Sequence, residues 1–414
     1  MTLTAADVAV PVASYAQRLH AAAGYDHHVA SPLGAWLLLA LCGTAATGEA
    51  RRRLDGTLGC DSGEAADLAA ELLASPHPLV PAAAAAWFGD ELADVAARWL
   101  AALPPSVPAS PMPSQADLDE WVRRHTLRLI ERFPGVPDPG LQLLVATALA
   151  TRVSWDTPFA LAPAAALGQF SPWAAGLSQV LRTPDDYSHQ QFVATTAAAG
   201  DVAVHTAWAS SQMTATTAGD LTVYNSAHGV TVTSVAAAPG VPPGQVLAAA
   251  YELAPAVAAR RELPRRSLFD LSLGDGPLWS ISERRDVVTS PSEREEWCIA
   301  VLPAWSARST LGLTPPGLGF DIAIPALMPG QPWDVSQVAL ARYTRLGFEA
   351  AAVTTMAGGG PPTQREGVVR RAELRFGHPY AVVAVAADSS GRGPWNGLPV
   401  FSAWVAEPSD AEPE

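Results

Sequence analysis

The sequence predicts an α+β protein, because helical and strand-like patterns occupy different parts of the chain. In most of the first third, apolar residues recur at helical spacing, and the clearest helix begins after Ser31. From Leu141 onward, most segments alternate or run apolar in the manner of strands, with Gly and Pro between them. A chain of 414 residues that is 49% hydrophobic can bury a large core, as one big domain or as two or three smaller ones.

The composition excludes several classes of function. The net charge of −14 argues against a nucleic-acid partner, because binding to a phosphate backbone requires a basic face. The sequence contains no lysine, which excludes a phosphate-loop lysine, a pyridoxal Schiff base and a kinase ATP lysine. Cys42, Cys60 and Cys298 are far apart and odd in number, so neither a disulfide framework nor a metal site is predicted. His27-His28 and the scattered acidic residues show no ligand or triad spacing, so we expect neither a cofactor nor an enzyme.

No segment of the sequence predicts a membrane partner. The N-terminus lacks a basic region before an apolar run, so no signal peptide is visible. The longest apolar helical segment, Leu33 to Cys42, is too short to span a bilayer. We expect a soluble protein that is cytoplasmic, or extracellular through unconventional export.

The helical part of the chain contains a buried helix with clear boundary signals. Ser31 is a suitable N-cap, and Pro32 suits the first helical position. The residues through Leu41 are apolar nearly all round, which is typical of a helix inside a large protein. Other helices are predicted over residues 5–23 and, as an amphipathic helix, from Asp117 to Phe133.

The strand-like part contains an uncharged run. Leu141 to Val153 carries no charge before Arg152, which predicts a strand buried on both faces. Trp155 and Phe159 follow the end of this run. A further strand is predicted from Gln337 to Leu346.

The segment after that strand combines small residues with a tip that excludes regular structure. It reads Gly347-Phe348-Glu349-Ala350-Ala351-Ala352-Val353-Thr354 and continues through three glycines to Pro361-Pro362. Alanine and threonine are small enough to fit between two strands without displacing a core. We therefore interpret the segment as an exposed loop that can enter a sheet.

The pattern Gly347-x-Glu349-Ala350-Ala351-Ala352-x-Thr354 resembles the hinge of the serpins, protease inhibitors that insert a reactive loop into their main sheet. The resemblance extends over residues 5–408 and implies a single serpin domain. The implied fold has a large central mixed β-sheet, two smaller sheets, about eight helices and an exposed reactive loop at about residues 345–373. We expect the acidic tail, residues 409–414, to be disordered.

The resemblance assigns roles to three groups of residues, in the hinge, in a shutter-like region and in the supporting structure. The groups are the hinge residues Gly347, Phe348, Glu349, Ala350, Ala351, Ala352 and Thr354; the shutter-like residues Ser31, Pro32, Thr147 and Gln337; and the structural residues Trp155, Phe159, His378 and Pro379.

The function implied by the resemblance is inhibition of serine (or cysteine) proteases by a suicide-substrate mechanism. The target protease cleaves the loop, whose N-terminal side then inserts into the sheet and carries the acylated protease along. Insertion of roughly 15 residues at ~3.4 Å each moves the protease by about 50 Å. The chain itself supplies no catalytic group, and we expect it to act as a monomer.

The position of the cleaved bond stays open between two alternatives. Counting from the hinge places it near Pro361-Pro362, whereas counting back from His378-Pro379 places it near Arg365-Glu366. Recognition of Arg365 would imply a trypsin-like target.

Several residues depart from the pattern of inhibitory serpins. Phe348 stands where these proteins have Thr or Ser, and a ring of that size costs roughly 1–3 kcal/mol unless a gap is made for it or it is already partly inserted. Arg345, Thr147 and Gln337 also differ from the usual residues, and glycines weaken an inserted strand. The alternative is therefore a non-inhibitory binding protein with the serpin fold.

Overall fold

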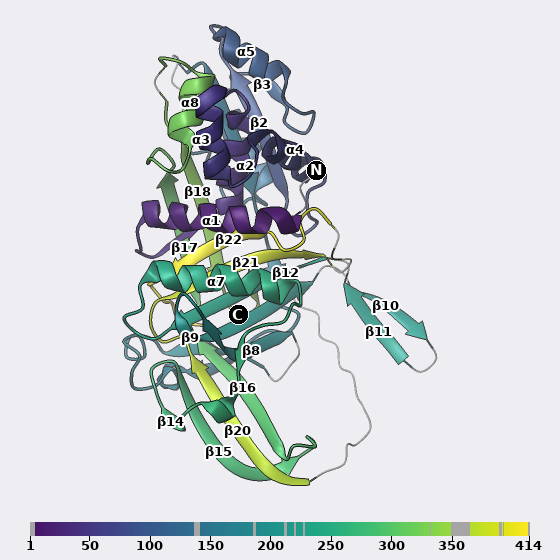
Figure 1. Ribbon diagram of the computed structural model, residues 1–414, viewed down its shortest axis with the longest axis vertical. Helices are drawn as coiled ribbons and strands as arrows, with labels where there is room; N and C mark the ends of the chain where they lie inside the picture. Colours follow the sequence, from purple (N-terminus) through teal and green to yellow (C-terminus); the bar gives the residue numbers. More distant parts are fainter. Residues whose placement is uncertain are drawn as a thin grey trace.

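The computed structural model describes residues 5–412, except 136–140, 185–187, 211–212, 219–220, 227, 332, 349–364, 389–390 and 392. The molecule is elongated, with most helices at one end and a sheet at the other (Figure 1). Eight α-helices lie within the described residues. Their bounds are α1 (Ala5–Ala23), α2 (Pro32–Gly43), α3 (Gly48–Leu58), α4 (Ser62–Ala74), α5 (Asp94–Ala101), α6 (Gln115–His125), α7 (Pro243–Ala258) and α8 (Phe320–Leu327).

Helix α2 is the central helix of the fold. Every one of its residues is buried, as its apolar composition predicts. The Ser31 hydroxyl accepts a hydrogen bond from the backbone N–H of Gly34, so the predicted N-cap is confirmed. None of the described helices is both long and apolar enough to cross a lipid bilayer.

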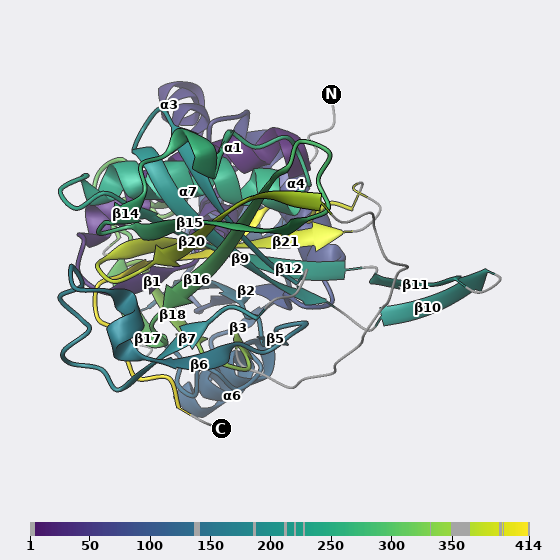
Figure 2. The ribbon, with the colours of Figure 1, turned by 90° about the horizontal axis from the view of Figure 1, so that it is seen from below.

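Two sheets form the β-rich half of the molecule. An antiparallel seven-stranded sheet is covered on one face by α7, and a six-stranded sheet extends to the far end (Figures 1 and 2). The strands of the first, in spatial order, are β1 (His28–Ala30), β22 (Pro399–Val405), β21 (Tyr380–Asp388), β12 (His228–Ala237), β9 (Gly200–Ser210), β8 (His189–Thr196) and β13 (Arg265–Arg266). Those of the second are β14 (Gly274–Asp275), β15 (Trp279–Val288), β20 (Arg365–Arg375), β16 (Arg294–Leu302), β7 (Gln179–Arg182) and β6 (Ala160–Pro163).

A third, mixed group of strands lies beside α2 and is divided into separately paired units. One unit is β3-β2-β4, another is β17-β18, and a short pair, β19-β5, lies further along the same strands. A separate hairpin, β10-β11, projects from the body (Figures 1 and 2). The bounds are β2 (Ala82–Phe88), β3 (Ala109–Pro111), β4 (Leu143–Leu149), β5 (Val153–Ser154), β17 (Trp305–Gly312), β18 (Ser336–Tyr343), β19 (Gly347–Phe348), β10 (Met213–Ala218) and β11 (Leu221–Ser226).

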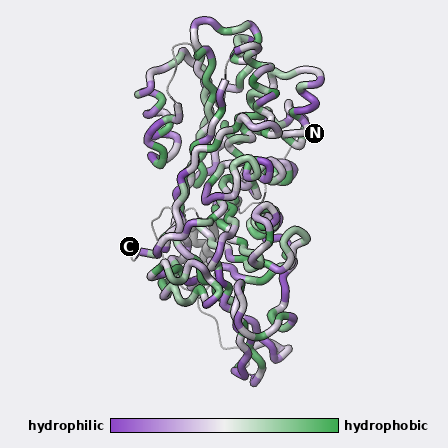
Figure 3. Tube along the Cα trace, turned by 90° about the vertical axis from the view of Figure 1, so that its left-hand side faces the viewer, coloured by the Kyte–Doolittle hydropathy of each residue, from purple (hydrophilic) through white to green (hydrophobic). Residues whose placement is uncertain are grey.

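The predicted fold class is confirmed, but the predicted end of one helix was wrong. Helix α6 ends at His125 and not at Phe133, because Leu127 and Arg128 have left-handed backbone angles that cannot continue a helix. In the acidic tail, the Asp410 carboxylate accepts hydrogen bonds from the backbone N–H groups of Ser178 and Gln179. Apolar residues follow the inner helices and strands, and hydrophilic residues gather at the tip of the six-stranded sheet (Figure 3).

Candidate functional site

The candidate site is an elongated cavity of about 710 Å³ between strands β4 and β18, which we call the slot. Its walls are residues 143–149 on one side and residues 336–342 on the other, and residues of α2 and of the α6 region complete the lining. β4 pairs with β2, and β18 pairs with β17, but no described strand pairs with either of them across the slot. Each of the two strands therefore has a backbone edge that faces the cavity without a ladder partner.

The slot explains the exposure of β4. The apolar run in this strand predicts burial on both faces, but of its residues only Ala148 is fully buried. Leu143 to Thr147 are half-buried because they line the cavity. The prediction of full burial was therefore wrong. The apolar side chains of β4 line a cavity, and a further strand that entered this cavity would cover them.

The slot closes where β5 pairs with β19. Val153 lies opposite Phe348, and the backbone N–H of Trp155 donates to the carbonyl of Leu346 at 3.1 Å. The indole N–H of Trp155 donates to the carbonyl of Thr344 at 3.0 Å. The predicted structural residue Trp155 therefore joins the strand before the loop to the strand across the slot.

Phe348 occupies a prepared place at this closed end. Its side chain is 5% exposed and lies edge-on to Trp305, with ring centroids 6.4 Å apart. The sheet thus already accommodates a large side chain at position 348. A further strand in the slot would continue from this residue, beyond the β19-β5 pair.

An aromatic cluster with a histidine pair lies behind the closed end. Phe159 contacts Tyr343 and His205, and the imidazoles of His205 and His189 stack with nitrogen atoms 3.1 Å apart. Burial, and then the neighbouring His189, lowers the pKa of His205 well below its usual value. Neither histidine could be identified from the sequence, because single histidines in strands carry no spacing signal. No group of three or more His, Cys, Asp or Glu side chains suited to a metal occurs among the described residues.

Three of the four predicted shutter-like residues meet at the wall of the slot. The Gln337 side chain accepts from the backbone N–H of Ser31 at 2.8 Å and donates to the Ser31 carbonyl at 2.7 Å. The Ser31 hydroxyl donates to the carbonyl of Val400, and the Thr147 hydroxyl donates to the carbonyl of Gly34, both at 2.9 Å. Side chains from both walls are thereby attached to the start of α2.

The remaining predicted residues lie elsewhere. Pro32 is the buried first residue of α2. His378 is hydrogen-bonded to the carbonyl of Ala237 at 2.8 Å, next to Pro379, on the connection from β20 to β21 and away from the slot. Burial is the main cause that lowers the pKa of His378.

The described residues include only part of the predicted loop. Gly347 and Phe348 form β19. Arg365 and Glu366 begin β20, where they pair with Val288 and Val287 of β15. The predicted residues outside the described part are Glu349, Ala350, Ala351, Ala352, Thr354, Pro361 and Pro362.

Comparison with known proteins identifies the fold. No family model and no curated protein matches the sequence. Among solved structures, the chain is similar to the thermophilic serpin tengpin in its native state, with 14% identity, a TM-score of 0.53 and coverage of 96% of this chain and 94% of that one. It is also similar to a cleaved form of Serpin 42Da, with 14% identity, a TM-score of 0.57 and 98% coverage of both chains. The chain is also similar to human thyroxine-binding globulin in complex with thyroxine, with 13% identity, a TM-score of 0.55 and coverage of 98% of this chain and 100% of that one.

These similarities extend over almost the entire chain and show that it has the serpin fold. At identities of this size they establish the fold and leave the activity to be argued from the site.

Proposed function

We propose that this protein inhibits serine (or cysteine) proteases as a suicide substrate. Residues 349–364, which connect β19 to β20, are the bait, and the slot is the place that receives them after cleavage. The target protease is the partner, and the inhibitor acts as a monomer. No catalytic group of the chain is required, because the protease supplies the chemistry up to the acyl-enzyme.

The single observation that carries this proposal is the slot. Its two walls, β4 and β18, each have one backbone edge that faces the slot and pairs with no described strand. A strand that entered between them would find hydrogen-bond partners on both sides, and apolar surface of β4 to cover. The free energy gained by that pairing is what would drive the cleaved chain into the slot.

The start of the bait is directly connected to the slot. Phe348 is the last residue of β19, and it is paired and buried at the closed end of the cavity. Because strand side chains alternate, an inserted strand that continues from Phe348 would turn Ala350 and Ala352 inward and Ala351 outward. These inward residues are small, as a tight space between two strands requires.

The two alternatives for the cleaved bond differ in their surroundings. Arg365-Glu366 is the first part of β20, which is paired with β15. A protease could bind this bond only after these first pairs open. Pro361-Pro362 precedes the strand, so its cleavage would not require such opening.

Denaturing gels test the proposal after incubation with trypsin-like and subtilisin-like proteases. We expect a covalent band at the summed mass of inhibitor and protease. Loss of the band in Arg365→Ala would assign the recognition residue, and its persistence would place the bond upstream. Clean cleavage by every protease, with no covalent band, would contradict inhibition.

A second candidate function is that of a non-inhibitory binding protein. The observation that favours it is Phe348, because its buried ring fills the place where the inserting strand begins. The similarity to thyroxine-binding globulin shows that the fold also occurs in a protein named for ligand binding. Cleaved chain that shows no increase in thermal stability would favour this function.

A further inference from the structure

A second cavity, of about 610 Å³, lies at the end of α6, and we call it the basic cleft. Its walls come from the end of α6 and the turn after it on one side, and from the chain that follows β4 and the loop that leads into β2 on the other. The lining residues are Pro78, Leu79, Pro81, Glu120, Arg123, Arg124, Leu127, Arg128 and Arg152.

The charge of the basic cleft is opposite to that of the whole molecule. The chain has a net charge of −14, yet four arginines and a single acid line this cavity. The acid, Glu120, already bonds to Arg123 at 3.0 Å. Within the described residues, neither Arg124 nor Arg128 forms an ion pair with an acidic side chain.

The backbone that presents Arg128 is strained. Leu127 and Arg128 have φ values of 53° and 62°, in the left-handed region that side-chain-bearing residues rarely adopt. Two consecutive residues of this kind persist only where the surroundings hold them, and such places are frequent at ligand-binding sites.

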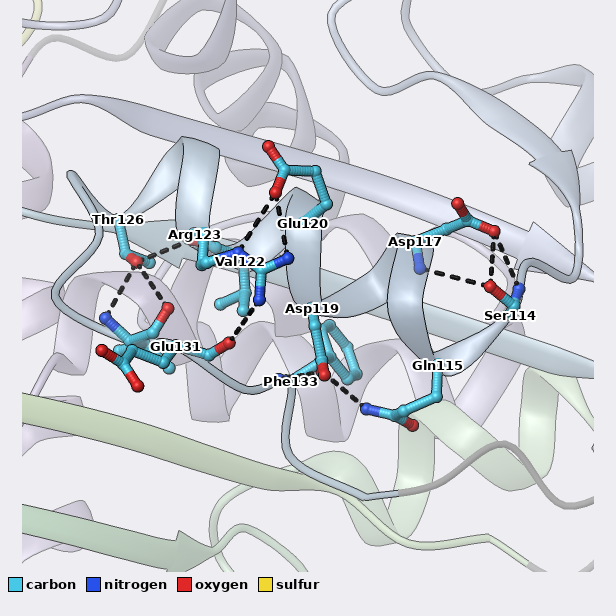
Figure 4. Close-up of polar contacts among 11 residues, drawn as sticks. Ser114, Gln115, Asp117, Asp119, Glu120, Val122, Arg123, Thr126, Glu131 and Phe133 are labelled. Atoms are coloured by element: carbon cyan, nitrogen blue, oxygen red, sulfur yellow. Dashed lines mark hydrogen bonds and ion pairs between the residues drawn. The ribbon is translucent and has the colours of Figure 1, made fainter.

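The surroundings here do hold the turn, as Figure 4 shows. The Thr126 hydroxyl donates to the carbonyl of Val122 at 2.6 Å, and a guanidinium nitrogen of Arg123 donates to the carbonyl of Glu131 at 3.1 Å. The backbone N–H of Phe133 donates to the carboxylate of Asp119 at 2.9 Å. The segment after α6 is thus held against the helix, and the backbone N–H of Arg128 donates to the carbonyl of Arg123 at 2.8 Å, which fixes the backbone from which the Arg128 side chain extends.

We propose that the basic cleft binds a compact oligoanion that carries phosphate groups, such as a di- or triphosphate. Guanidinium groups donate paired hydrogen bonds whose geometry matches phosphate oxygens. Arg124 and Arg128 supply this chemistry from one wall, and the positive charge of Arg152 lines the other. The arginines surround a concavity and do not form a stripe, which fits a compact ligand better than a long polyanion.

The same two walls separate the basic cleft from the slot. Thr126 and Leu129 face the slot, whereas Leu127 and Arg128 line the cleft. On the other wall, Thr151 lines the slot and Arg152 lines the cleft. An anion bridging the two walls would attach the α6 region to the end of β4. One consequence rests on the proposed function: the bound anion would slow insertion of the cleaved loop.

Calorimetric titration of the full chain with inorganic tripolyphosphate in physiological salt tests the site without any protease. We expect saturable 1:1 binding, which the double variant Arg124→Gln/Arg128→Gln weakens at least about tenfold through loss of two charge-assisted donors. Arg152→Gln should weaken it as well, from the opposite wall. The matched control, Arg52→Gln/Arg53→Gln on α3, removes the same charge far from the cleft and should leave the affinity unchanged. A nucleoside triphosphate titrated in parallel distinguishes a nucleotide from free polyphosphate.

Absence of saturable tripolyphosphate binding would overturn the proposal, and so would an equal loss of affinity in the α3 control. Thermal unfolding of each variant without ligand shows whether it is folded, and Arg152→Gln keeps the test decisive if the double variant is not. Failure of the gel assay for inhibition would leave this binding result intact, so the two proposals can fail separately.

Discussion

At the scale of single residues, Gln337 has the most specific structural task at the slot. Its amide satisfies both the backbone N–H and the carbonyl of Ser31, the residue that caps α2. The sequence shows only an amide near the start of a strand, so neither of these two hydrogen bonds could be predicted from it.

We predict that Gln337→Ala lowers the free energy of unfolding by about 1–3 kcal/mol, because it leaves two backbone groups of Ser31 without their partner. Urea denaturation of the intact protein measures the change. Gln331→Ala, at an exposed residue that also lines the slot, is the matched control and should have little effect. Equal stability of both variants would contradict the role of Gln337.

A second prediction concerns the buried histidine pair His20 and His28. Their ring nitrogens are 2.6 Å apart, and His20 also bonds to Ser402 at 2.7 Å. Burial, and then the neighbouring His28, lowers the pKa of His20 to about 3. In the unfolded chain, the His20 imidazole binds a proton with the ordinary pKa of about 6.5. The contribution of neutral His20 to the free energy of unfolding is therefore fully present above pH 6.5 and is lost as the pH falls toward 3.

At pH 5 the loss from His20 alone is about 2 kcal/mol, an order-of-magnitude value from a difference of 1.5 pH units. Urea midpoints measured from pH 7.5 to pH 4.5 should therefore decrease below about pH 6.5. The decrease should be smaller in His20→Gln, whose side chain cannot be protonated. A wild-type midpoint that stays constant to pH 5 would contradict the account.

At the scale of elements, the strand after the bait is held from both sides. β20 pairs with β15 from Arg365 to Leu374 and with β16 from Val368 to Arg375. Residues 255–296 are rich in Arg and Glu and show only fragments of strand pattern, so the pairing of β15 with β20 could not be predicted from the sequence.

We predict that Val288→Pro speeds tryptic cleavage at Arg365-Glu366, because proline opposite Arg365 removes a backbone N–H that faces β20. The Val287 N–H bonds instead to the Asp286 carboxylate, and ladder donors alternate along the strand. Mass spectrometry of the fragments gives the rate, which we expect to rise at least about tenfold if local opening limits cleavage. Cleavage after other arginines is the internal control and should not change. An unchanged rate at Arg365 would mean that β15 does not protect this bond.

At the scale of the whole molecule, local sequence patterns predicted individual helices and strands better than they predicted which of these elements pair or pack together. The buried helix after Ser31 and the strand before the loop follow from periodicity and turn residues. The slot did not follow, because it is a missing pairing between two strands nearly 200 residues apart, and an apolar strand that lines a cavity has the same pattern as a buried one. The histidine pairs and the basic cleft likewise depend on tertiary contacts that no local spacing encodes.

The measurement that tests the central claim most directly is thermal unfolding before and after a single cleavage within residues 349–364. Insertion into the slot predicts a rise in the melting temperature of at least about 10 °C, which for a chain of this length corresponds to roughly 9 kcal/mol. Ala352→Glu should abolish the rise, because its side chain would point into the sheet, whereas the matched control Ala351→Glu should retain it. An unchanged melting temperature of the cleaved wild-type chain would contradict the claim that the slot receives the loop.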